Sequence, residues 1–150
     1  MRRAIVTGLL FALACGGAEA PPPSPTVATA EPVRGGFAIE REGYTWNVRG
    51  PVRVENEAAA ITAEDGRGAL QLDGGGWVLL DRQSRATLTL EALTLQTGRV
   101  WVDARDVEVR VQTEEGELRG VDATFAVDRT GEGTEVYCGS GEVAWVAGGE

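Results

Sequence analysis

The stretch Leu93-Thr94-Leu95-Gln96-Thr97-Gly98-Arg99-Val100-Trp101-Val102 decides the fold class, because its pattern returns 43 residues later as Val136-Tyr137-Cys138-Gly139-Ser140-Gly141-Glu142-Val143-Ala144-Trp145. In both copies two alternating apolar residues precede a glycine, and two more come after it. Such alternation is typical of a strand with one buried face, and the glycine marks a point where a strand bends. A shorter partial copy of the pattern, Gly50-x-Val52-x-Val54, precedes both. We therefore predict stacked units of strand, glycine and strand, the alternative being chance recurrence in a valine-rich sequence.

The rest of the chain from residue 37 onward has the same period of two. Val107, Val109 and Val111 alternate with charged or polar residues, and Phe125 and Val127 flank Ala126. Turn signals rich in glycine and acidic residues separate these runs at intervals of about ten residues. No segment of this region has apolar residues at helical spacing. The predicted fold class is therefore all-β, with short strands and hairpins in a roll, sandwich or short solenoid over residues 37–150.

The N-terminus has the features of an export signal. Arg2 and Arg3 precede an apolar run at residues 4–14, and this run is shorter than the about 20 residues of a membrane-spanning helix. Residues Ala12-Leu13-Ala14-Cys15 resemble the lipobox of bacterial lipoproteins, although Ala12 stands where that motif usually has Leu or Val. The resemblance implies removal of residues 1–14, lipid on Cys15, and anchoring in the cell envelope, by default in the outer membrane facing the periplasm. The alternative is simple secretion without lipid.

Residues 15–36 differ in composition from residues 37–150. Gly, Ala, Pro, Ser, Thr and Glu predominate, with Pro21, Pro22, Pro23 and Pro25 close together. Such a stretch has little apolar surface to offset the entropy of ordering. We therefore predict that residues 15–36 form the lipidated N-terminus and a disordered linker, and that residues 37–150 form the β-domain.

Charge and composition exclude several functions. The formal net charge is −9, and loss of Arg2 and Arg3 with the signal makes it −11, which disfavours nucleic acid as a partner. The chain contains no histidine, so the commonest general base is missing. We therefore expect no enzyme, no catalytic residue, no cofactor and no metal. The acidic groups that could contradict this expectation lie at predicted strand ends and turns, where solvated acids are common: Asp103, Asp106, Glu108, Glu114, Glu115 and Glu117.

The tryptophans are the best candidates for a binding surface. Trp101 lies between Val100 and Val102 and so points to the opposite face of its strand, while Trp77 comes directly after a run of glycines. An exposed tryptophan can stack on a sugar or anchor a protein partner, although Trp101 could instead fill a second packed layer. Trp46 and Trp145 alternate with valines and are expected in the core. Cys138 is expected to be a small buried hydrophobe, the alternative being a reactive thiol.

The order of the motifs resembles the periplasmic FecR-like domain over about residues 50–146. The matching segments are Gly66–Leu72, Trp77–Leu80, Leu93–Val102, Glu108–Thr113, Val121–Val127, Gly133–Val136 and Gly141–Val143. Asp122-Ala123 stands where the family has Gly-Thr, so we expect Gly120 to make the turn there. Better-known members relay an iron-citrate signal to a sigma factor through a cytoplasmic segment, for which we find no residues.

These observations lead to one functional expectation and one alternative. The resemblance implies a non-catalytic envelope lipoprotein whose β-domain binds an envelope protein or senses a small ligand. The alternative is a glycan- or peptidoglycan-binding module. In both cases Trp101 and Trp77 are the candidate contact residues, and the sequence leaves the oligomeric state open.

Overall fold

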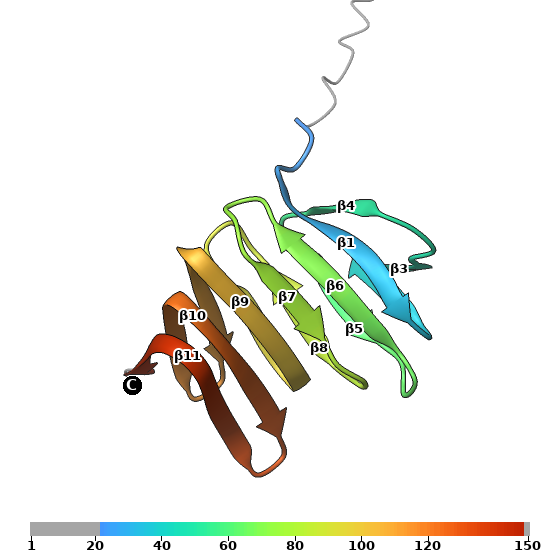
Figure 1. Ribbon diagram of the computed structural model, residues 1–150. Coiled ribbons are helices and arrows are strands. Elements are labelled where there is room, and N and C mark those ends of the chain that lie inside the picture. The colour runs from blue at the N-terminus through green and yellow to red at the C-terminus, as the bar shows by residue number, and fades with distance from the viewer. Residues whose placement is uncertain (1–21, 149–150) are drawn as a thin grey trace, which may run out of the picture.

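The protein folds into one curled antiparallel sheet (Figure 1). The structure, a computed structural model, describes residues 22–148. This part of the chain has no helix, which confirms the all-β class. Its strands are β1 (Thr26–Arg34), β2 (Phe37–Arg41), β3 (Tyr44–Asn47), β4 (Val52–Glu55), β5 (Ala59–Thr62), β6 (Arg67–Leu72), β7 (Trp77–Leu80), β8 (Arg85–Leu88), β9 (Leu93–Thr113), β10 (Gly116–Thr130) and β11 (Gly133–Ala147).

Strand β9 joins the two arms of the sheet. Its residues 93–97 pair with β8, which leads through β5 and β2 to β3, and its residues 100–103 pair with β7, which leads through β6 and β1 to β4. Between these two segments Gly98 has a φ of +86°, and a Cβ there would lie 2.3 Å from Ser84 Oγ. Glycine is therefore needed at this bend, where the first copy of the sequence repeat has it.

The long strands β9, β10 and β11 form a meander that bends once more. The bend is carried by three residues with positive φ on neighbouring strands: Asp106 at 62°, Asp122 at 47° and Gly141 at 76°. Asp122 itself therefore takes the left-handed conformation, and the expectation that Gly120 makes this turn is wrong. A side chain at Gly120 would instead collide with the ring of Phe125, since its Cβ would lie 2.2 Å from Cε1.

The core fills the inside of the curl. Both segments of β9 contribute buried residues, Leu93 and Leu95 before the bend and Val100 and Val102 after it. Val109 and Val111 of β9 and Phe125 and Val127 of β10 are also buried, as their alternation predicts. At roughly 1.5–3 kcal/mol for each buried Val, Leu or Phe, these inward rows are the main source of stability.

The predicted linker boundary is wrong. Strand β1 lies inside residues 15–36 and pairs with both β4 and β6, burying Val27, Ala28 and Ala30. The prolines that suggested disorder, Pro21, Pro22, Pro23 and Pro25, precede this strand in the sequence. Pro32 lies within the strand near its end, where the register shifts. Residues 15–21 lie outside the described residues.

Three residues expected in the core are exposed. Trp46 is on β3, Cys138 and Trp145 are on β11, and each of these strands pairs with only one neighbour. Their side chains are on the predicted inner side, because their partners across the ladder are buried Ile39, Phe125 and Leu118. They remain exposed because no further strand among the described residues covers them.

Candidate functional site

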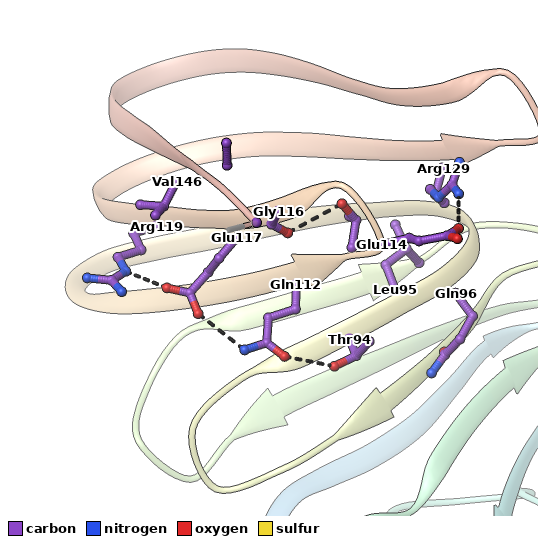
Figure 2. A pocket seen from close by; sticks show the side chains of 13 residues that line it. Thr94, Leu95, Gln96, Gln112, Glu114, Gly116, Glu117, Arg119, Arg129 and Val146 are labelled. Atoms are coloured by element: carbon purple, nitrogen blue, oxygen red, sulfur yellow. Dashed lines mark hydrogen bonds and ion pairs between the residues drawn. The ribbon is translucent and has the colours of Figure 1, made fainter. Parts of the chain in front are cut away.

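Two hollows on the surface of the described residues differ in chemistry. The first, of about 620 Å³, is open and has charged and polar side chains among its lining residues (Figure 2). Each charged side chain in it is already paired: Arg129 Nη2 lies 2.6 Å from Glu114 Oε2, and Arg119 Nε lies 2.5 Å from Glu117 Oε1. Gln112 also donates to Glu117. These internal pairs leave few free groups for a ligand.

Three of the six acids singled out in the sequence are paired with arginines two positions further along the same strand. This spacing places both side chains on one face, as in Asp103–Arg105, Glu108–Arg110 and Glu117–Arg119. The hydrogen bond from Arg119 holds the pKa of Glu117 below its usual value, and Arg105 does the same for the pKa of Asp103. A lowered pKa is the opposite of what a catalytic general acid needs.

The second hollow, of about 380 Å³, lies on the outer face of the sheet over β7, β9, β10 and β11. Its main side chains are Trp77, Leu79, Trp101 and Tyr137, and we call these four the aromatic groove. Its lining is almost wholly apolar, in contrast to the first hollow. Apolar hollows with a few polar groups at the edge are the usual form of a binding site.

The strand register brings the groove together. Leu79 of β7 pairs with Trp101 of β9, which pairs with Ala126 of β10, which pairs with Tyr137 of β11. Trp77 is two residues from Leu79 and therefore diagonal to Trp101, within reach of an aromatic ring. Ala126 is fully buried although it is not part of the core cluster. Its small side chain leaves the space between the two flanking aromatic residues.

Charged and polar groups border the groove at both ends. At one end Arg99 is paired with Asp128, and its guanidinium lies 5.9 Å from the centroid of the Tyr137 ring. The hydrogen bond from Tyr137 to Glu135 raises the pKa of that phenol, which keeps it neutral. At the other end the Thr124 and Ser140 hydroxyls are 2.7 Å apart.

Both tryptophans singled out in the sequence belong to this groove. Trp77 is 49% exposed and Trp101 is 48% exposed, so within residues 22–148 no second packed layer covers them. Sequence reasoning missed Tyr137 as a groove residue. Tyr137 could have been predicted from the turn between Thr130 and Gly133. If these two residues pair, the antiparallel register places Tyr137 opposite Ala126.

The remaining points concern lipid attachment, metal binding and membrane-spanning helices in the described part of the chain. Cys15, the predicted lipid attachment site, lies outside it. Residues 22–148 contain no group of three or more acidic or sulfur-bearing side chains placed to hold a metal ion. The same residues include no helix that could cross a membrane.

The described residues therefore form a curled all-β domain with an open aromatic groove on its outer face. The model of the FecR protein family matches residues 56–144, more than half of the chain, and the chain therefore belongs to the FecR protein family. The match runs from the turn after β4 into β11 and includes every residue of the aromatic groove. Proteins of this family act in regulation or sensing rather than in catalysis. No match is found among curated proteins.

Proposed function

We propose that this chain is an exported sensing domain of the cell envelope whose aromatic groove binds an apolar side chain of another envelope protein. The observation that carries the proposal is the joint exposure of Trp77, Trp101 and Tyr137 around one apolar hollow. Family membership supports a regulatory or sensing role in the periplasm.

The physical case rests on what these residues do at interfaces. Trp, Tyr and Arg are the residue types most enriched among those that dominate binding energy, and three aromatic side chains of these types meet here with Arg99 at the edge. The tryptophan rings offer a large apolar area at a low cost in side-chain entropy. The paired ions at the border, such as Arg99–Asp128, would exclude water from a bound side chain.

The N-terminal sequence supports the proposed location in the cell envelope. The signal at residues 1–14 and the lipobox-like sequence before Cys15 favour a lipoprotein held in the envelope, by default at the outer membrane. The predicted net charge of −11 would keep the domain off anionic membrane surfaces. Contact with a protein on the same side of that membrane is then the simplest use of the groove.

The test is capture of a partner from envelope extract with three immobilised proteins: the native mature chain, Trp101→Ala and Trp46→Ala. Trp46 is the matched control, because it is also a half-exposed tryptophan but lies on β3, outside the groove. We expect one protein to be retained by the native chain and Trp46→Ala and lost with Trp101→Ala. Equal retention by all three, or none by the native chain, would contradict the proposal.

The second candidate function is glycan binding. It is favoured by the polar groups next to Trp77 and Trp101, namely the Asp103 carboxylate and the Thr124 hydroxyl, because sugars combine ring stacking with hydrogen bonds. Soluble peptidoglycan fragments should then quench tryptophan fluorescence in the native chain and in Trp46→Ala but not in Trp101→Ala. Absence of quenching in the native chain would remove this candidate.

A further inference from the structure

Strand β11 ends the sheet and repeats a pattern that is buried elsewhere. Its inner row, Val136, Cys138, Val143 and Trp145, corresponds one to one with Leu93, Leu95, Val100 and Val102 of β9. The β9 residues are at most 3% exposed, and Val100 and Val102 have paired strands on both sides, whereas Val136 is 39% and Trp145 is 44% exposed on a strand with one neighbour. Within residues 22–148, the second copy of the repeat therefore has its core-forming side chains but only one neighbouring strand, β10.

The free edge of β11 also lacks several of the features that usually block strand pairing. Natural edge strands are protected by lysines, prolines, bulges or short length, and of these β11 has only the irregularity near Gly141. β11 is 15 residues long and contains neither proline nor any basic residue, and its only charged residues are Glu135 and Glu142. Among the described residues it pairs with β10 alone.

We propose that β11 pairs with β11 of a second copy of this chain, antiparallel and around a two-fold axis. The register that fits places Val136 opposite Trp145 of the second copy and Cys138 opposite its Val143. In this register every inner-row residue meets another inner-row residue, so the cores of the two copies become continuous. The bend at Gly141 meets the bend of the second copy, because the axis passes between residues 140 and 141.

Charge agrees with this register. Glu135 lies opposite Val146 and Glu142 lies opposite Gly139 of the second copy, so the two acids of one strand never face those of the other. Pairing along residues 134–147 would form about a dozen backbone hydrogen bonds between the copies.

The first test is the oligomeric state of the mature chain, residues 15–150 with Cys15→Ser, by sedimentation and light scattering. We expect a dimer for the native β11 and a monomer for Val136→Lys, which places a charge in the inner row. Val136→Lys combined with Trp145→Glu should restore the dimer, because the introduced lysine of each copy then lies opposite the introduced glutamate of the other. Leu90→Lys, at an exposed apolar position away from β11, should remain dimeric.

The second test reads the register directly with one cysteine per chain. A chain that keeps Cys138 is mixed with a chain carrying Cys138→Ser and Val143→Cys, under mild oxidation. Opposed residues have Cα atoms about 4.5–5.5 Å apart, within the range of a disulfide, whereas two copies of Cys138 would be out of reach. We expect a covalent dimer in the mixture and none in either chain alone.

A monomer at every concentration would overturn the inference, as would a dimer that forms no mixed disulfide. The inference goes beyond the proposed function and fails independently of it. Trp101→Ala should leave the dimer intact, and Val136→Lys should leave the residues of β7 and β9 in the groove unchanged.

Discussion

The backbone N–H of Asp106 donates a 2.7 Å hydrogen bond to Asp122 Oδ1, and both residues have positive φ. This contact ties β9 to β10 at the point where the meander bends. Aspartate tolerates the left-handed conformation better than most residues, because its short side chain can bond locally. Asp122 therefore supplies both the conformation and the acceptor at a position where the FecR-like pattern has glycine.

Asp122→Ala should destabilise the domain by about 1–3 kcal/mol, because it leaves the Asp106 N–H without this acceptor and strains the backbone. Asparagine at this position retains an acceptor and tolerates positive φ. Asp122→Asn should therefore lose clearly less stability than Asp122→Ala. Urea denaturation monitored by circular dichroism measures both free energies of unfolding. Equal losses for Ala and Asn would contradict the role given to this bend.

Gly98→Ala should lower the free energy of unfolding further, with a total loss of at least about 3 kcal/mol. The new Cβ would require a φ of +86° and would lie 2.5 Å from Ser84 Cα, which cannot move aside like a flexible side chain. Gly131→Ala is the control, since nothing lies within 4 Å of a Cβ there. A thermal melt of the two variants should show a large loss for the first and almost none for the second.

Stability should not change between about pH 5.5 and 8, because the chain has no histidine to titrate there. Below about pH 4.5 it should fall. Arg119 lowers the pKa of Glu117, and Arg85 lowers that of Glu40. Burial would raise the pKa of Asp81, but its bonds to the Arg82 N–H and to Arg67 outweigh this effect. A folded-state pKa below the unfolded value stabilises the fold above the unfolded pKa, and that contribution is lost on acidification.

Melting temperatures measured from pH 3 to 8 check this expectation. Glu117→Gln should reduce the acid-dependent part of the loss, since the amide cannot titrate. A transition centred near pH 6.5 would show that a group outside this set controls stability.

The N-terminal prediction is tested by mass spectrometry of the protein isolated from its host membrane. We expect residues 1–14 to be absent and Cys15 to carry acyl mass, because the residues before it resemble a lipobox. Cys15→Ala should be found uncleaved or released into the soluble fraction. An unmodified N-terminus at Cys15 would instead support simple secretion.

Alternation of apolar and polar residues was enough to predict the strands. It could not show which strands have a neighbour that buries their inward side chains. Val109 and Val111 are buried as expected, while Trp145 and Cys138 point to the predicted side and remain exposed. Period-two alternation identifies the face on which a side chain lies, and only the strand order shows whether another strand lies alongside. Strand β1 could not be recognised from the sequence, because prolines lie close to it and its buried residues Val27 and Ala28 are adjacent rather than alternating.

Only part of the aromatic groove was predictable, because local patterns give the face of a side chain but not the pairing of distant strands. Trp101 points outward as the alternation indicated, and the hairpin turn could have paired Tyr137 with Ala126. The position of Trp77 depends on β7 pairing with β9, a register that no short turn determines. Its contribution to the groove therefore required the structure.

The central claim is that the aromatic groove contacts a partner in the envelope, and photo-crosslinking in living cells tests it most directly. A photo-reactive amino acid replaces Thr124, which lines the groove, and in a control chain it replaces Thr45, which is exposed on β3. We predict a discrete protein adduct from position 124, abolished by adding Trp101→Ala, and no such adduct from position 45. No adduct at 124, or the same adduct from both positions, would contradict the claim.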